Sequence, residues 1–264
     1  MLKKLTPSFS LTFDTPIWKI EASSSANRLF LELRDADQHQ VRFAAIDLLS
    51  GQLLWSDFTL PEPWWVTLAS ASDDYLLLQS FTDTHNPEKK TYFAIDANTR
   101  KLLWQSSNFQ IIRLEKSQLI GYNTEDESRT LMQIELPGGG MEKYPAQKMP
   151  DRKNKDFLQP FFYSENQPYF TTVANFVESL ELPRPVGSCE YLEYGAYICI
   201  AYYVANEDSE LANYLLIIDQ DGTILLHECL EVSVPNVGLG TFFIAQDQLI
   251  VVQHKLQLVS YALS

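Results

Sequence analysis

Cysteine is scarce in this sequence, and long apolar runs are absent. The 264 residues include three cysteines, none adjacent to another: Cys189, Cys199 and Cys229. An odd number of cysteines in a chain of this length argues against a disulfide framework and favours a reducing compartment. No segment approaches the roughly 20 apolar residues of a membrane-spanning helix, and residues 1–10 lack the apolar stretch of a signal peptide. We therefore expect a cytoplasmic protein.

Basic residues are also scarce in this sequence. Lys and Arg number 20 against 34 Asp and Glu, which gives a net charge of −14. Nucleic acid binding needs cations that displace counterions from phosphates, and an anionic membrane attracts basic surfaces. We therefore expect neither nucleic acid nor membrane as a partner. A basic protein, a cation or a neutral ligand fits the composition, and another protein is the partner that we predict.

Catalytic and cofactor motifs are missing as well. The chain has no nucleophile elbow and no phosphate-binding loop, and the glycines at 138–140 follow a proline and precede no helix, which favours a turn. The run Asp-Gln-Asp-Gly at 219–222 resembles part of a calcium loop but lacks its terminal Glu. The four histidines show no metal-ligand spacing: His39, His85, His227 and His254. We predict no catalytic, cofactor or metal residue.

What the sequence does contain is an internal repeat. Residues 44–55 read AAIDLLSGQLLW and residues 93–104 read FAIDANTRKLLW, 49 residues further along. In a third, weaker copy a histidine takes the place of the tryptophan. The positions that define the repeat are Asp47, Gly51 and Trp55 in the first copy, Asp96 and Trp104 in the second, and Asp219, Gly222 and His227 in the third.

Each copy predicts a strand, a turn and a second strand. The Asp carboxylate can bind backbone amides of the adjoining turn, small or polar residues form the tip, and the Trp of the second strand can pack against a neighbouring sheet. Two further strand-like runs precede each copy. Four short strands in 40–50 residues are typical of a β-propeller blade, so we predict an all-β fold.

The pattern Ala-x-Asp-x-x-(Ser/Thr)-Gly-x-x-x-Trp resembles the tryptophan-docking repeat of quinoprotein-type (PQQ-like) β-propellers. The first copy matches it throughout, and the second has Arg100 in place of the glycine. The resemblance implies a propeller and no activity. Dehydrogenases of that superfamily hold their cofactor beside a vicinal cysteine pair and a calcium site on eight blades. This chain has no adjacent cysteines and is too short for eight such blades, so PQQ binding is not expected.

We expect residues 1–264 to form one propeller domain of five four-stranded blades. The units are 17–58, 64–107, 109–145, 188–231 and 237–264, and residues 9–13 can supply a missing strand to the last one. Residues 146–187 are predicted to be an irregular, helical insertion, with apolar residues at i, i+3, i+4 and i+7: Val173, Phe176, Val177 and Leu180. Thr171 or Thr172 is the expected helix cap. Six blades, with this segment as an irregular blade, is the alternative.

Aromatic clusters mark the candidate interaction surface. Trp64 and Trp65 are adjacent, so on a strand they point to opposite faces. A second cluster lies in the insertion, and clusters of this kind serve protein or ligand contact when exposed. The residues predicted for the surface are Trp64, Trp65, Phe161, Phe162, Tyr163 and Tyr169. Our leading hypothesis is a non-enzymatic scaffold that offers a rigid face to another protein.

The alternative is a cryptic hydrolase or small-ligand binder, with a pocket at the central channel or under the insertion. Some five-bladed propellers are glycosidases whose carboxylates converge on the channel. Glu21, Glu115 and Glu193 lie near the predicted first strands of their blades. Converging carboxylates with perturbed pKa values in a deep pocket would favour the enzyme, whereas a broad exposed aromatic patch would favour the scaffold.

Overall fold

The computed structural model describes residues 4–23, 25–81, 89–115, 117–136, 139–144, 157–205 and 210–263. These residues form five antiparallel sheets and one α-helix, so the predicted all-β class is confirmed. Four of the sheets are meanders of consecutive strands, as in the blades of a β-propeller, and the fifth joins strands from both ends of the unit that holds it. Each predicted sequence unit supplies most of the strands of one sheet. The chain divides into two compact units.

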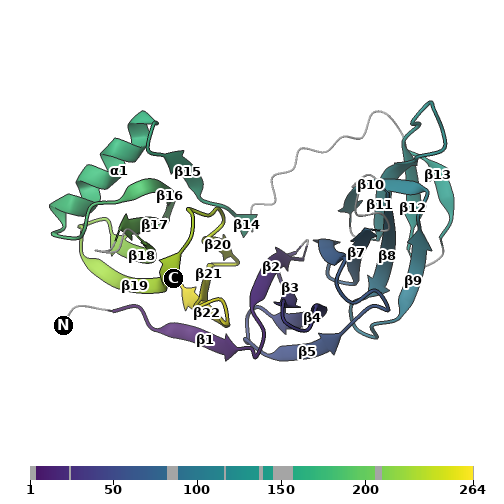
Figure 1. Ribbon diagram of the computed structural model, residues 1–264, viewed down its shortest axis with the longest axis horizontal. Coiled ribbons are helices and arrows are strands. Elements are labelled where there is room, and N and C mark those ends of the chain that lie inside the picture. Colours follow the sequence, from purple (N-terminus) through teal and green to yellow (C-terminus); the bar gives the residue numbers. More distant parts are fainter. Residues whose placement is uncertain are drawn as a thin grey trace. The chain divides into compact units, whose positions relative to one another are not determined.

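The first unit, Thr15–Lys155, contains three four-stranded sheets (Figure 1). The first sheet consists of β2 (Ile17–Ala22), β3 (Arg28–Asp35), β4 (Gln40–Asp47) and β5 (Leu53–Phe58). The second consists of β6 (Val66–Ala71), β7 (Tyr75–Phe81), β8 (Lys90–Asp96) and β9 (Leu102–Ser106). The third consists of β10 (Phe109–Glu115), β11 (Gln118–Asn123), β12 (Met132–Glu135) and β13 (Met141–Lys143).

Consecutive sheets of this unit pack face to face. On β7, Leu76 and Leu78 enter the core shared with the first sheet, and Leu77 between them enters the core shared with the third. Side chains alternate between the two faces of a strand, and both faces of the second sheet are covered. The second strand of this blade is therefore a continuous apolar run instead of an alternating one.

The second unit combines Met1–Asp14 with Asp156–Ser264. The fourth sheet has the order β15 (Phe161–Ser164), β16 (Val186–Tyr194), β17 (Tyr197–Ala205), β18 (Leu211–Asp219) and β19 (Ile224–Val234). The fifth has the order β1 (Pro7–Thr12), β22 (Gln257–Ala262), β21 (Gln248–Gln253), β20 (Phe242–Ala245) and β14 (Phe157–Leu158). β1 pairs with β22, with Phe9 opposite Ser260, so the strand predicted from residues 9–13 does complete the last sheet.

Part of the predicted insertion adds strands to these sheets. β14 pairs with β20 of the fifth sheet and β15 with β16 of the fourth, while residues 145–156 lie outside the described residues. The helical pattern corresponds to α1 (Pro168–Ser179), whose buried Phe170, Val173 and Val177 pack against the fourth sheet (Figure 1).

The predicted helix cap is wrong. The N-cap is Gln167, and Thr171 and Thr172 are exposed residues inside the helix. The helix begins earlier because Pro168 occupies its first turn, where the fixed φ of proline suits a helix and its missing N–H costs nothing.

The repeat hairpins have the predicted turn chemistry. Asp47 Oδ1 accepts hydrogen bonds from the Ser50 amide at 2.9 Å and the Ser50 hydroxyl at 2.6 Å. Asp96 Oδ1 accepts one from the Thr99 amide at 2.7 Å, and Asp219 Oδ1 accepts one from the Thr223 amide at 2.8 Å. These bonds to the ionised form lower the pKa of Asp47, chiefly through Ser50, and of Asp96, chiefly through Thr99.

Candidate functional site

The first strands of the three sheets in the first unit share an irregularity. The register between first and second strand shifts around Trp18 on β2, around Ala69 on β6 and around Ile112 on β10. A β-bulge inserts one extra residue, which bends the strand and redirects its side chains. β6 contacts both β2 and β10, so the three bulged strands line one part of this unit.

Two of these strands carry the same chemistry. Residues 17–21 read IWKIE and residues 111–115 read IIRLE, an apolar pair followed by a cation, an apolar residue and a glutamate. The cation and the glutamate form an ion pair in both: Lys19 with Glu21 at 3.0 Å and Arg113 with Glu115 at 2.8 Å. The second sheet has small residues here, Leu68-Ala69-Ser70-Ala71. The middle strand therefore leaves space between two strands that carry cations.

A cavity of about 500 Å³ occupies this space. Three cations line it, Lys19 from β2, Lys90 from β8 and Arg113 from β10, and its other polar side chains include those of Gln79, Tyr92 and Gln110. No Asp or Glu is among the described residues that line it. In a chain with net charge −14, every charged side chain that lines this cavity is a cation.

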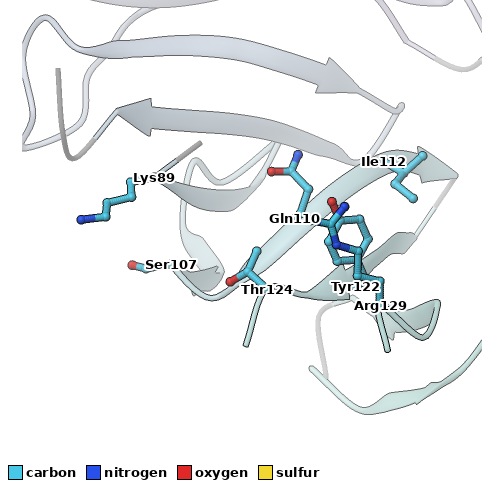
Figure 2. A pocket seen from close by; sticks show the side chains of 7 residues that line it. All are labelled: Lys89, Ser107, Gln110, Ile112, Tyr122, Thr124 and Arg129. Atoms are coloured by element: carbon cyan, nitrogen blue, oxygen red, sulfur yellow. The ribbon is translucent and has the colours of Figure 1, made fainter. Parts of the chain in front are cut away.

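A second cavity of about 590 Å³ adjoins the first, and both are lined by Gln110 and Ile112. Figure 2 shows most of its lining side chains near β10 and β11, with Lys89 and Ser107 further to one side. Two more cations line it, Lys89 and Arg129, and the Arg129 guanidinium lies 5.4 Å from the centre of the Tyr122 ring. The two cavities together contain five of the 20 Lys and Arg residues of the chain.

The three cations of the first cavity are held differently. Lys19 Nζ donates to the Leu68 carbonyl oxygen at 2.7 Å, in addition to its ion pair. Arg113 Nη2 donates to the Tyr144 hydroxyl at 2.7 Å, whereas its Nε lies near Glu115 outside hydrogen-bond geometry. Lys90 Nζ lies 5.4 Å from the centre of the Phe81 ring and pairs with no carboxylate among the described residues.

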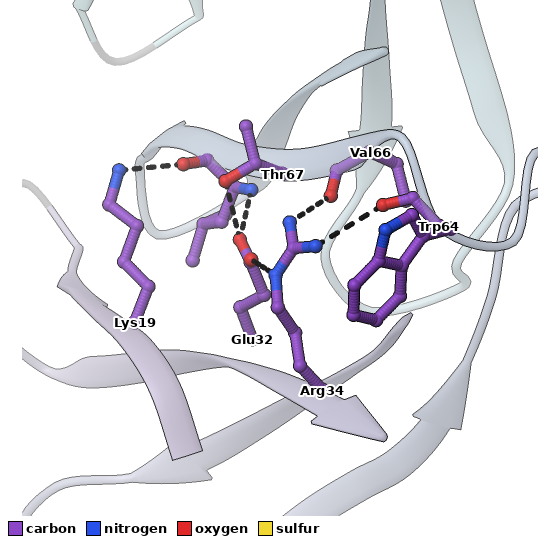
Figure 3. A network of polar contacts seen from close by, with 7 residues as sticks. Lys19, Glu32, Arg34, Trp64, Val66 and Thr67 are labelled. Atoms are coloured by element: carbon purple, nitrogen blue, oxygen red, sulfur yellow. Dashed lines mark hydrogen bonds and ion pairs between the residues drawn. The ribbon is translucent and has the colours of Figure 1, made fainter. Parts of the chain in front are cut away.

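A buried carboxylate fixes the β6 side of the cavity (Figure 3). Glu32 is fully buried and accepts hydrogen bonds from Arg34 Nε at 2.6 Å, Thr67 Oγ1 at 2.6 Å and the Leu68 amide at 2.7 Å. Arg34 also donates to the Val66 carbonyl oxygen at 2.6 Å. Because Thr67 and Leu68 both line the cavity, the network holds one wall of it in place.

The predicted tryptophans of this unit differ in exposure. Trp64 is half-buried against the core between the first two sheets, with the Arg34 guanidinium 5.1 Å from its ring centre, while Trp65 is 48 % exposed. The Glu62 carboxylate accepts hydrogen bonds from both backbone amides. Sequence reasoning missed Trp18, which is 69 % exposed and whose ring centre lies 5.6 Å from the same guanidinium.

The predicted aromatic residues of the second unit lie on β15 and α1. Phe161, Phe162 and Tyr169 are exposed, and Tyr163 is half-buried with its ring centre 5.4 Å from that of Tyr169. We call these four residues the β15–α1 aromatic surface. β15 is an edge strand whose pairing partner among the described strands is β16.

Two of the glutamates considered for a hydrolase lie in the first unit and the third lies in the second. Glu21 and Glu115 are paired to Lys19 and Arg113, and neither lines the cavity. Glu193 belongs to the second unit, where it accepts a hydrogen bond from the Tyr191 hydroxyl.

Burial affects the ionisation of one histidine and two cysteines of the described structure. Burial lowers the pKa of His227, which stacks on Tyr202 and Tyr214 and whose Nε2 lies 2.9 Å from the Tyr202 hydroxyl. Burial raises the pKa of the Cys189 and Cys199 thiols to about 12. His39 and His254 have a positive φ, and His85 lies outside the described residues.

The described residues contain no helix that is long and apolar enough to cross a membrane. No three His, Cys, Asp or Glu side chains of the described residues gather as a metal site would require.

Comparisons with known proteins give a partial family match. Residues 22–104, about a third of the chain, match a family described as a domain of unknown function (DUF4905). No curated protein matches the sequence.

Solved structures with a similar course of the chain include three of low identity. The first is an uncharacterized protein from Listeria monocytogenes EGD-e, with 9 % identity and a TM-score of 0.33 over 90 % of this chain and 75 % of that one. The second is TolB from Acinetobacter baumannii, with 10 % identity and a TM-score of 0.31 over 94 % of this chain and 55 % of that one. The third is the β-propeller domain of the trilobed protease from Pyrococcus furiosus, with 9 % identity and a TM-score of 0.34 over 93 % of this chain and 79 % of that one. The chain spans about half the length of TolB. At these scores none of the three informs the function of this chain.

Proposed function

We propose that this chain is a non-enzymatic propeller scaffold that binds a basic, partly apolar segment of another protein on the β15–α1 aromatic surface. The observation that carries the proposal is the exposure of Phe161 and Tyr169, 65 % and 67 %, on neighbouring elements of the second unit. Exposed aromatic side chains offer a large contact area at a small cost in conformational entropy.

The charge of the second unit supports a basic partner. This unit contains 4 Lys and Arg against 15 Asp and Glu, a net charge of −11, whereas the first unit has 16 against 19, a net charge of −3. Complementary charge accelerates association and disfavours acidic partners. Four of the six predicted aromatic residues and most of the chain's excess negative charge therefore occur in the same unit.

No observation favours the hydrolase alternative. Cations and amides line the cavities that we describe, where paired carboxylates would be needed. We also keep the cytoplasm as the proposed compartment, because Cys189, Cys199 and Cys229 are free thiols in the structure.

We further propose that the blades are related to the tryptophan-docking repeat of quinoprotein-type propellers. The support is the hydrogen bond from Trp55 of the first sheet to the Ala97 carbonyl oxygen of the second, together with the Asp turns at Asp47, Asp96 and Asp219. The proposal concerns the blade and implies no PQQ site.

Selection from a random peptide library on the immobilised chain tests the partner chemistry. We expect the enriched peptides to combine Lys or Arg with aromatic or aliphatic residues, and their affinity to fall at least tenfold in a Phe161→Ser, Tyr169→Ser double variant. Val232→Ser is the matched control, because Val232 is an exposed apolar residue on β19 of the same unit. Enrichment of acidic peptides, or equal binding to all three proteins, would refute the proposal.

A further inference from the structure

We propose that the cavity lined by Lys19, Lys90 and Arg113 in the first unit is a binding site for a small anionic ligand that bears a carboxylate or phosphate group. This site is independent of the β15–α1 aromatic surface, because all its lining residues belong to Thr15–Lys155. A volume of about 500 Å³ is within the range of small-molecule sites.

The argument begins with charge. Three cations and no Asp or Glu line the cavity, in a chain with 14 excess negative charges. Lys19 and Arg113 are compensated by Glu21 and Glu115. Lys90 has no such partner among the described residues, so its ammonium is the group that an anion would neutralise.

Hydrogen-bond donors are already oriented around this charge. Gln110 Nε2 donates to the Tyr92 hydroxyl oxygen at 2.8 Å, which leaves the Tyr92 hydroxyl hydrogen to be donated elsewhere. Burial raises the pKa of Tyr92, so the hydroxyl remains a donor at neutral pH. Arg113 is fixed by Tyr144 and is only 12 % exposed, and it adds a second cation that needs little reorganisation.

The backbone explains why the space is open at this place. At its bulge, β6 has the small residues Ala69 and Ser70. The corresponding positions are Trp18 and Lys19 on β2 and Ile112 and Arg113 on β10, which are all larger. Ala69, Leu68 and Ile112 line the cavity and give it an apolar wall. The ligand class that fits is therefore a small organic acid or phosphate ester, whose anionic group faces Lys90 and Tyr92.

Calorimetric titration of the full chain with citrate, inorganic phosphate and glucose in a HEPES buffer tests this site. We expect saturable binding of citrate, phosphate or both, and none of glucose. Lys90→Met keeps the apolar stem and should weaken binding at least tenfold, and Tyr92→Phe should weaken it several-fold. Lys101→Met is the matched control, because it removes an equal charge from an exposed position outside both cavities.

Each outcome decides the question. Binding that depends on Lys90 or Tyr92 and not on Lys101 supports the site, and the stronger of the two probes identifies the anionic group. The absence of binding by both anions, or equal binding by the Lys90 and Lys101 variants, overturns the proposal. Tyr92→Phe covers the case in which Lys90→Met does not fold. Failure here leaves the peptide-binding proposal standing, because that surface shares no residue with the cavity.

Discussion

Trp55 Nε1 donates a hydrogen bond of 2.9 Å to the carbonyl oxygen of Ala97. The donor is on the last strand of the first sheet, and the acceptor comes directly after the aspartate of the second sheet's repeat. Ala97 is 1 % exposed, so its carbonyl would otherwise lose solvent without gaining a partner. The bond therefore couples one repeat of the chain to the next.

This contact predicts a difference between the two repeat tryptophans. Trp55→Phe removes the bond and leaves a buried acceptor unsatisfied, so we expect a loss of about 1–3 kcal/mol in the free energy of unfolding. Trp104 packs edge-to-face on Phe109 and has no such bond among the described residues. Trp104→Phe should cost less. Urea unfolding of the two variants measures this, and equal losses would contradict a specific role for the bond.

Glu32 should be the most sensitive carboxylate of the first unit. Glu32→Gln replaces an acceptor of three donors by an amide and leaves Arg34, only 16 % exposed, without its counter-charge. We expect a loss of about 3–5 kcal/mol. Glu21→Gln breaks a half-exposed ion pair and should cost less than about 1 kcal/mol. Thermal unfolding followed by circular dichroism measures both, and a mild effect of Glu32→Gln would contradict the network in Figure 3.

His227 should make stability depend on pH. Its pKa is lowered by burial from the usual value of 6.5, so as the pH falls below that value the unfolded chain takes up a proton before the folded protein does. The free energy of unfolding contributed by this residue is complete above pH 6.5 and declines as the pH falls. His227→Gln cannot titrate. Urea unfolding at pH 7.5 and at pH 5 should show a greater acid loss for the natural chain, and equal losses would exclude this linkage.

The repeat turns predict two substitutions of opposite sign. Gly51 and Arg100 occupy the same turn position, four residues after the aspartate, with φ of +67° and +60°. Gly222, with φ of +80°, ends a turn that is one residue shorter. A residue with a side chain is destabilised by about 1–2 kcal/mol in this left-handed conformation. Glycine avoids that strain but raises the conformational entropy of the unfolded chain, which offsets part of the gain. Arg100→Gly should therefore stabilise the chain by about 0.5–1 kcal/mol. Gly51→Ala should destabilise it by a similar amount, and the same sign for both would be inconsistent with these turns.

The blades were predictable because their signals are local. The Asp-to-Trp spacing of eight residues depends on one hairpin, and the apolar run Leu76–Leu78 on one strand. The predicted caps of α1, Thr171 or Thr172, lie four or five residues after the observed N-cap Gln167. Threonine is a typical capping residue, whereas Pro168 is typical of a first helical turn. The sequence contains both the threonines and the proline, and the observed helix begins at the proline.

The cavity was not predictable in the same way. It depends on three strands, of which the first and the last have their bulges 94 residues apart in the sequence. No local sequence pattern predicts these bulges. One signal was available. The runs IWKIE at 17–21 and IIRLE at 111–115 are similar and lie on corresponding strands, and their comparison would have singled out Lys19 and Arg113. Lys90 joins them through tertiary packing alone.

The pairing of β1 with β22 sets the order in which the molecule can be assembled. Ser10 and Gln257, which share a hydrogen bond, are separated by 247 positions, so closing that loop costs about 5 kcal/mol of chain entropy. The first unit is one uninterrupted stretch, Thr15–Lys155, and can fold while the ribosome is still translating the second. In the second unit, β1 is synthesised first but cannot pair until residues 257–262 of β22 have left the ribosome. The fifth sheet is therefore the last of the five that can be completed.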